Sequence, residues 1–341
     1  MAPSLPSTYK AAVLPAVNAA LSFQEVPLTH PGPNEILVKV LACAVCFSDH
    51  ALQTGHLGDV FPRIPGHEVV GDVVEVGSAV TGFRVGERVG GGWHGGHDGT
   101  CKACRRGLYQ MCGHRVVRGV TADGGYAQYA LMRAEAVAGV PPDMDPAQAA
   151  PLLCAGVTTF NAIRRLGVPA GALLAVQGLG GLGHLAVQFA SRMGYHVVAL
   201  SSGDAKRKFA AGLGAMAYID TSTEDAVKRL NEMGGADVVV CTAPSAKAIS
   251  PLVGGLAAGG KMLILSAAGP VEFDSGMLLT RGISVHGWPS GHALDWEEAI
   301  EFARRKGVEC MIEKFKFEDA SAAMEHMIAG KARFKCVLVM E

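Results

Sequence analysis

The sequence lacks an excess of charge of either sign, and it lacks any block of basic residues. Its 341 residues include 30 Lys and Arg against 31 Asp and Glu. Proteins that follow a phosphate backbone concentrate positive charge on one surface. The balance of charges therefore argues against nucleic acid as a partner.

Long apolar runs are also missing. Although 49% of the residues are hydrophobic, Gly, Pro or polar residues interrupt every apolar run well before the roughly 20 residues that a membrane span needs. The first ten residues, MAPSLPSTYK, contain neither the basic start nor the apolar stretch typical of a secretory signal. We therefore expect no membrane partner and predict a cytoplasmic location.

The length predicts two domains, because single hydrophobic cores usually stop growing near ~250 residues. Residues 1–157 are rich in Gly and Pro, and their short β-rich runs, such as 35–41 and 69–77, are typical of many short strands joined by turns. This pattern predicts a small β-barrel-like domain. Residues 300–341 follow a helix–strand–helix–strand pattern and are expected to complete it.

Strands and helices alternate in residues 158–299. An apolar strand at 172–177 is followed by a glycine turn and by apolar residues at helical spacing. A later helix is predicted to begin with a capping box formed by Thr221 and Glu224. Four further strands are predicted, at residues 197–200, 217–219, 237–241 and 261–266. This alternation indicates a doubly wound parallel sheet with its ligand at the carboxyl edge of the strands.

Three of the nine cysteines lie in a tight array, Cys101, Cys104 and Cys112, which Asp98 precedes. In a cytosolic chain such an array favours metal binding over disulfides. Because a carboxylate can bind zinc, we predict a closed structural zinc site made of one Asp and three Cys, with His97 or His94 as alternatives to Asp98. The cysteines in apolar surroundings are predicted core residues: Cys43, Cys241, Cys310 and Cys336.

A second set of metal donors consists of Cys46, the pair His67 and Glu68, and Cys154. Three such ligands and one exchangeable position describe a zinc that polarises a carbonyl or acidifies an alcohol. A single cysteine or histidine would more often be a core residue, and Glu68 could instead be a carboxylate paired inside the fold. The joint spacing favours the metal site.

Three polar residues follow Cys46. Ser48 is placed to exchange a proton with the substrate, although it could be an ordinary turn hydroxyl. Asp49 is a candidate acceptor for the N–H of His67, which would fix the imidazole tautomer. His50 is a candidate for the end of a proton relay, but a structural or surface role is the stronger alternative.

The turn Gly178–Gly183, which includes Gly180, Gly181 and Leu182, follows a strand and opens a helix. In this context the glycines allow close backbone approach, and the helix N-terminus faces a pyrophosphate. The turn therefore predicts a dinucleotide site.

Ser201 stands at the end of the next strand, about where enzymes specific for NAD carry an acid that binds the adenosine ribose. Its neutral side chain removes repulsion against a 2′-phosphate, while Ser202, Lys206 and Arg207 supply donors and charge. NADP(H) is therefore favoured over NAD(H). In the alternative, Asp204 accepts the ribose hydroxyls.

These motifs, in this order and spacing, resemble the zinc-dependent medium-chain alcohol dehydrogenases of the medium-chain dehydrogenase/reductase superfamily over nearly the whole chain. The resemblance implies a GroES-like β-rich catalytic domain plus a Rossmann domain. It implies that Cys46, His67 and Cys154 hold the catalytic zinc, that Glu68 is a displaceable ligand and that Ser48 starts the proton relay.

The resemblance also assigns Trp93 to a wall of the substrate pocket, Thr158 to the nicotinamide and Lys335 to the pyrophosphate. Trp93 could instead be simple packing. Two departures stand out. His50 lies four residues after Cys46, where many relatives place a relay histidine five residues after the first cysteine, so Ser48 could pass its proton through a cofactor hydroxyl or water. Asp98 occupies the first position of a usual four-cysteine cluster.

We therefore expect an oxidoreductase with two zinc ions per chain that transfers hydride between NADP(H) and a small alcohol, aldehyde or ketone. The alternatives are a zinc-free NADPH double-bond reductase or a polyol dehydrogenase of the same superfamily, and a non-catalytic zinc-binding protein. The resemblance further implies a homotetramer or homodimer, in which a strand at 283–286 could extend the sheet between subunits.

Overall fold

The computed structural model describes residues 5–340, which fall into two compact units. Residues 1–4 and 341, which include the start of the N-terminal segment discussed above, lie outside the description. Unit 1 runs to Cys154 and also contains Gly291–Glu301 and the chain from Cys310 onward, whereas unit 2 comprises Ala155–Ser290 and Phe302–Glu309. In the described part of the chain, no helix is long and apolar enough to cross a membrane.

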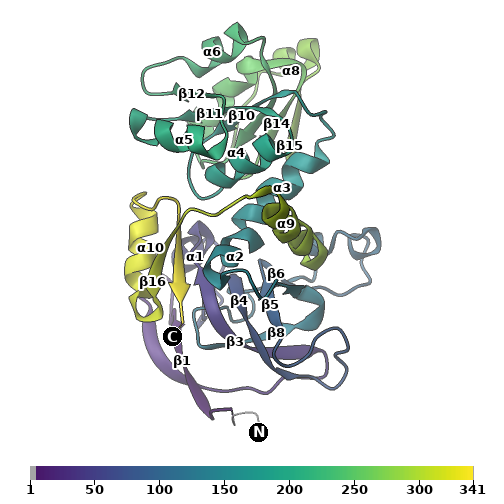
Figure 1. The fold of residues 1–341 in the computed structure, drawn as a ribbon, viewed down its shortest axis with the longest axis vertical. Coiled ribbons are helices and arrows are strands. Elements are labelled where there is room, and N and C mark those ends of the chain that lie inside the picture. Colours follow the sequence, from purple (N-terminus) through teal and green to yellow (C-terminus); the bar gives the residue numbers. More distant parts are fainter. Residues whose placement is uncertain (1–4, 341) are drawn as a thin grey trace. The chain divides into compact units, whose positions relative to one another are not determined.

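Unit 1 is built on a seven-stranded sheet with β3 (Glu35–Ala44) near its centre. β3 pairs antiparallel with β4 (Glu68–Val76), β8 (Tyr129–Arg133) and the C-terminal β17 (Lys335–Val339), as can be followed in Figure 1. Side chains from these strands form one apolar core. The last strand of the chain thus lies beside the strand that leads to Cys46.

Most of the other elements of unit 1 are short. They are β1 (Thr8–Val13), β2 (Ser22–Pro27), α1 (Phe47–Gln53), β5 (Arg88–Gly91), β6 (His94–Gly96), β7 (Val116–Val117), β9 (Ala138–Gly139), α2 (Pro146–Ala149), β16 (Ile312–Lys316) and α10 (Ala320–Ile328), and α9 (Ala293–Lys306) has residues in both units.

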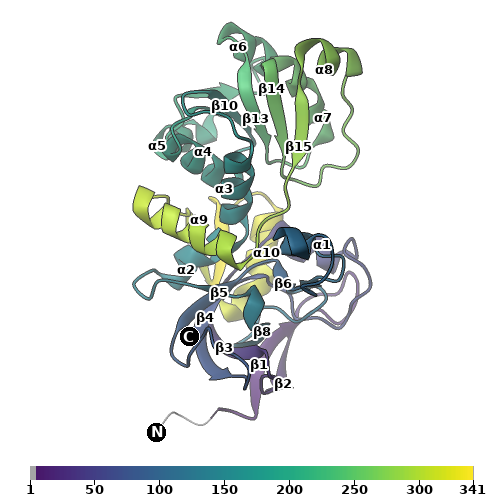
Figure 2. The same ribbon diagram turned by 90° about the vertical axis from the view of Figure 1, so that its right-hand side faces the viewer.

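Unit 2 contains a six-stranded parallel sheet in the order β12-β11-β10-β13-β14-β15, with helices on both faces (Figures 1 and 2). Its central strands are almost entirely apolar, as strands buried on both faces must be. The predicted doubly wound sheet is confirmed. Its strands are β10 (Leu173–Gln177), β11 (His196–Ser201), β12 (Ala217–Asp220), β13 (Ala236–Cys241), β14 (Leu256–Ile264) and β15 (Ser284–Gly287).

One helix of unit 2, α3 (Ala155–Arg165), precedes the first strand of the sheet, and the other five each follow one of its strands. These five are α4 (Gly183–Arg192), α5 (Arg207–Leu213), α6 (Ala226–Glu232), α7 (Ala246–Ile249) and α8 (Ser275–Arg281).

The predicted capping box at Thr221 is wrong. Helix α6 begins after Asp225, whose carboxylate accepts a hydrogen bond from the main-chain N–H of Lys228 at 3.1 Å. Glu224 instead accepts from the main-chain N–H of Asp220 at 3.1 Å, so it stabilises the turn that leaves β12. A nearer capping residue therefore took the position that the sequence pattern assigned to Thr221.

The four cysteines predicted in the core are buried. Cys43, Cys241 and Cys336 are 0% exposed and Cys310 is 3% exposed. This prediction is confirmed.

Candidate active site and metal centres

Cys46 lies at the junction between β3 and α1. It is the N-cap of the helix, and its main-chain N–H donates to Asp49 Oδ2 at 2.9 Å. Because the Asp49 carboxylate satisfies one of the free N–H groups at this helix end, the chain turns sharply and leaves the Cys46 sulfur at the end of the strand.

Gly66 fixes the turn before His67. Its φ is +93°, and a Cβ at this position would lie 2.3 Å from the ring of Tyr126 and 2.8 Å from the sulfur of Cys43. Only glycine combines that backbone conformation with so close a contact. The Gly-His-Glu motif therefore positions His67 and Glu68 through the backbone.

The structure brings the predicted catalytic donors together. One ligand atom from each of Cys46, His67, Glu68 and Cys154 lies within 4.8 Å of those of the other three. Cys154 reaches the group from the end of a short 3₁₀ helix, Ala150–Leu153, and its sulfur lies 3.3 Å from His67 Nε2. His67 and Glu68 are buried.

The donor chemistry of this group fits zinc. Two thiols, an imidazole and a carboxylate are ligands that zinc takes in tetrahedral sites. Glu68 Oε2 is buried and has no hydrogen-bond partner among the described residues, whereas buried carboxylate oxygens normally have one. A cation at the centre of the group would satisfy this atom.

The electrostatics of the group favour a charged thiolate. The hydrogen bond from Cys154 and the charge of His67 hold the pKa of Cys46 well below its usual range, despite burial. Burial lowers the pKa of His67, but the Cys46 thiolate and the Asp49 carboxylate outweigh it and raise the pKa to about 10. Cys46 is thus the donor held as the deprotonated sulfur that metal binding requires, while His67 and Cys154 must lose their protons when a metal binds.

Lys335 lies behind Glu68. Its Nζ is 2.6 Å from Glu68 Oε1 and donates to the carbonyl oxygen of Val45 at 2.8 Å, and both charged side chains are almost fully buried. Burial raises the pKa of Glu68, and Lys335 opposes that rise. The predicted contact of Lys335 with the pyrophosphate stays a prediction. The sequence analysis missed the pair with Glu68, for which a lysine that opens an otherwise apolar strand is the only signal.

Asp49 contacts three parts of the site. Its Oδ1 lies 3.5 Å from His67 Nδ1 and accepts from the main-chain N–H of Gly66 at 3.2 Å. Its Oδ2 accepts from the hydroxyl of Tyr126 at 3.1 Å. The structure thus places Asp49 beside the imidazole, where a carboxylate orients a metal-binding histidine. Tyr126, which completes this network, was not among the predicted site residues.

The remaining predicted residues of the catalytic region lie around this group. The Ser48 hydroxyl is 3.8 Å from the Cys46 sulfur. The ring of Trp93 meets the ring of His67 edge to face, with 5.0 Å between centroids. His50 Nδ1 is 3.5 Å from Gln53 Oε1, and its ring packs against Phe47, so both of these contacts lie within α1.

The second donor group contains Asp98, Cys101, Cys104 and Cys112, again with all ligand atoms within 4.8 Å of one another. The sulfur of Cys101 lies 3.6 Å from that of Cys104 and 3.8 Å from that of Cys112. Asp98 Oδ2 is 2.7 Å from His114 Nδ1, and this contact holds the pKa of Asp98 well below its usual range. A deprotonated carboxylate thus completes the three sulfurs.

The two alternatives to Asp98 are engaged elsewhere. His97 Nδ1 lies 3.2 Å from His94 Nε2, and the ring of His97 stacks on Tyr109. Neither histidine belongs to a donor group among the described residues.

The predicted dinucleotide turn joins β10 to α4. A Cβ at Gly183 would lie 1.8 Å from the carbonyl oxygen of Gly178, so close packing between strand and helix requires glycine there. At Gly180 a Cβ would meet nothing within 4 Å, so its surface is open to a ligand, as the close approach of a pyrophosphate requires. Thr158 lies on α3 and is 8% exposed.

Ser201 ends β11, the strand beside the glycine turn, and is 8% exposed. Asp204, the alternative ribose acceptor, forms an ion pair with Arg207. The guanidinium of Arg207 also lies over the ring of Tyr218, 4.8 Å from its centroid. Arg207 therefore has partners of its own at this end of the sheet.

Comparisons with known proteins agree with this geometry. Residues 32–142 match the alcohol dehydrogenase GroES-like domain, and residues 181–305 match the zinc-binding dehydrogenase domain. The chain is 51% identical over 340 residues to the alcohol dehydrogenase patD of Penicillium expansum, with 100% of both chains covered. It belongs to the zinc-containing medium-chain alcohol dehydrogenase family. The alcohol dehydrogenase notN of an Aspergillus species is 50% identical, with 99% of this chain and 100% of notN covered.

Among solved structures, a cinnamyl alcohol dehydrogenase from Sorghum bicolor matches with a TM-score of 0.90 and 31% identity, covering 97% of each chain. As a member of the alcohol dehydrogenase family, this chain is a zinc-dependent oxidoreductase that acts on CH–OH groups. The two donor groups are its catalytic and structural zinc sites, and the fold implies a nicotinamide cofactor.

Proposed function

We propose that this alcohol dehydrogenase prefers NADP(H) and interconverts a small primary or secondary alcohol with its aldehyde or ketone. The observation that carries the proposal is the convergence of Cys46, His67, Glu68 and Cys154 within 4.8 Å, with the hydroxyl of Ser48 beside Cys46. The buried and partner-free Oε2 of Glu68 gives the site a fourth donor that substrate can displace.

The residues of the chain have separate roles in this proposal. Cys46, His67 and Cys154 hold the zinc, which when bound supplies a Lewis acid for the substrate oxygen. Asp49 holds the imidazole of His67 in one orientation. Ser48 gives a proton to the substrate oxygen on reduction and takes one from it on oxidation. A nicotinamide, when bound, would supply or accept the hydride. The ring of Trp93 forms a wall beside His67.

Replacing Ser48 with alanine tests the proton transfer. Positioned acid–base groups contribute about 10²- to 10⁴-fold, so kcat for aldehyde reduction should fall at least about a hundredfold. Zinc content should stay unchanged, because the serine is not a ligand. Ser48→Thr keeps a hydroxyl and serves as the matched control. A Ser48→Ala enzyme with the wild-type kcat would show that another group moves the proton.

The cofactor preference follows from Ser201. A neutral residue at the end of β11 puts no negative charge against a 2′-phosphate, and Ser202 and Lys206 lie in the next turn. Ser201→Asp should lower kcat/KM for NADPH relative to NADH by about tenfold or more, because a like charge would face the phosphate. Ser201→Asn introduces an uncharged side chain of the same size as Asp and is the control. Equal ratios in both variants would contradict this assignment.

The enzymatic alternatives differ in their need for metal. A zinc-free double-bond reductase has no use for the Cys46, His67 and Cys154 set, and a polyol dehydrogenase should turn over sugar alcohols. Aldehyde reduction that chelation abolishes, without turnover of sugar alcohols, supports the proposal over both.

Cytoplasmic location stays a prediction.

We also propose a homo-oligomer formed through β15. This strand is at the edge of the parallel sheet. Its Val285 is 40% exposed, and Leu279 on the preceding helix is 82% exposed. An exposed apolar edge strand is a template for pairing with a second chain. Val285→Glu should therefore halve the mass measured by light scattering, whereas Val285→Thr should not. A wild-type monomer would contradict the proposal.

A further inference from the structure

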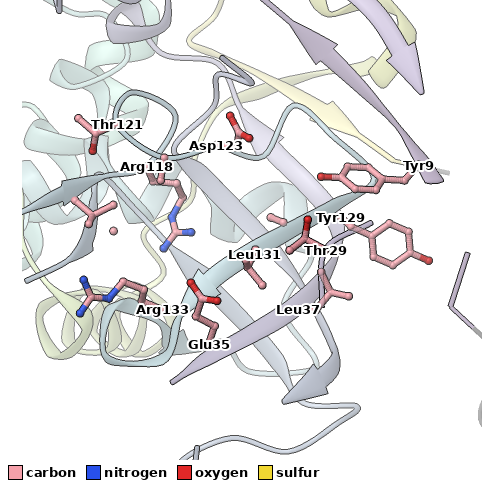
Figure 3. A pocket seen from close by; sticks show the side chains of 15 residues that line it. Tyr9, Thr29, Glu35, Leu37, Arg118, Thr121, Asp123, Tyr129, Leu131 and Arg133 are labelled. Atoms are coloured by element: carbon pink, nitrogen blue, oxygen red, sulfur yellow. The ribbon is translucent and has the colours of Figure 1, made fainter. Parts of the chain in front are cut away.

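A cavity in unit 1 is lined by none of the metal ligands. Its volume is about 350 Å³, at the low end of the ~300–1,000 Å³ typical of small-molecule sites. In Figure 3 the tyrosines Tyr9 and Tyr129 stand toward one side of the view, and Arg118, Arg133 and Glu35 gather toward the other. The cavity thus has an aromatic part and a charged part.

Arg118 is the unusual residue of this lining. It is 2% exposed, and its Nε and Nη2 donate only to the main-chain carbonyls of Gly92 and Ala136, at 3.3 and 3.2 Å. Among residues 5–340, no carboxylate oxygen lies within 4.0 Å of a guanidinium nitrogen of Arg118, the distance that defines an ion pair. Burial lowers its pKa to about 10. Buried guanidinium groups are normally paired with an anion.

The other charges of the lining are compensated, with one exception. Arg133 pairs with Glu135 at 2.6 Å, and Asp123 pairs with Arg63 at 2.9 Å. Glu35 forms no ion pair among the described residues, and its Oε2 accepts one main-chain N–H, that of Gly32, at 3.0 Å. One cation and one anion of the cavity wall therefore remain for a ligand.

We propose that this cavity binds a small aromatic carboxylate that carries an ammonium or hydroxyl group beside the carboxylate. Arg118 receives the carboxylate through charge-assisted hydrogen bonds. Glu35 accepts the neighbouring donor group, and the apolar body lies against Tyr9, Tyr129 and Leu131. This site is separate from the catalytic zinc and independent of the proposed substrate.

Isothermal titration calorimetry of the zinc-loaded enzyme tests the proposal with three probes. L-Phenylalanine carries both groups, 3-phenylpropionate lacks the ammonium and phenethylamine lacks the carboxylate. We expect one phenylalanine bound per chain, binding of 3-phenylpropionate about tenfold weaker, and no saturable heat with phenethylamine. The missing ammonium contact should cost about that factor, whereas phenethylamine would bring a second cation to the buried Arg118 in place of a carboxylate.

Two variants locate the site. Arg118→Met should weaken phenylalanine binding by about tenfold or more. Thr29→Trp fills the cavity from an exposed position of its wall, so it should do the same in a folded protein, while Thr29→Ser should bind like the wild type. Both variants should retain bound zinc.

Several outcomes would overturn the proposal. They are the absence of saturable phenylalanine binding, equal affinity for 3-phenylpropionate, and wild-type affinity in Thr29→Trp. Binding that survives Thr29→Trp but disappears on chelation would place the probe at the catalytic zinc instead.

Discussion

Cys46→Ala is expected to lower kcat/KM for aldehyde reduction by about a thousandfold and to remove the catalytic zinc from the purified protein. Cys46 supplies the thiolate with the lowered pKa, and it lies within 4.8 Å of the other three donors. Polarisation of the substrate oxygen by a metal is worth several kcal/mol, and each 1.36 kcal/mol is about a factor of ten in rate. Metal analysis and initial rates on the same preparation measure both effects.

The matched control for this prediction is Cys241→Ala. Cys241 is fully buried in β13 and belongs to neither donor group. The control variant should keep both zinc ions and near wild-type kcat/KM, with a modest loss of stability from the small cavity. Full zinc content and full activity in Cys46→Ala would show that Cys46 is not a ligand.

Lys335→Met is expected to lower the free energy of unfolding by about 3–5 kcal/mol, because it leaves a buried charge without its partner. The Glu68 carboxylate is 0% exposed and the Lys335 side chain 6% exposed, with 2.6 Å between Nζ and Oε1. Urea denaturation of the zinc-loaded protein measures the loss. The expected direction does not depend on the role of Lys335 at the cofactor.

Two comparisons sharpen this test. Lys314→Met breaks an ion pair of 2.8 Å with Asp145, in which both side chains are about half exposed, and should cost at most about 1 kcal/mol. In a double-mutant cycle, Glu68→Gln combined with Lys335→Met should cost less than the sum of the single changes. Strict additivity would mean that the two groups do not stabilise each other.

The sequence predicted the parts of this enzyme that short-range chemistry determines. The turn Gly178–Gly183 could be predicted because its glycines are required locally, where Gly183 packs against the carbonyl oxygen of Gly178. The residues of the two donor groups could be predicted because zinc binds a small set of ligand types. The parallel sheet of unit 2 follows from the alternation of strands and helices.

The contacts that were missed join residues far apart in the chain. Lys335 on β17 meets Glu68 on β4 across 267 positions of the chain, because both strands pair with β3 in the sheet. No local pattern encodes that pairing. Tyr126 reaches Asp49 across 77 positions. The wrong capping box at Thr221 has a different cause, since Asp225 is also a good capping residue and its helix starts later.

The most direct test of the account is the initial rate of aldehyde reduction with NADPH, measured on protein of known zinc content before and after chelation. We predict two zinc ions per chain, one for each donor group, and loss of turnover when the catalytic zinc is removed, with recovery when zinc is restored. Turnover that continues at the original rate after complete removal of metal would contradict the central claim.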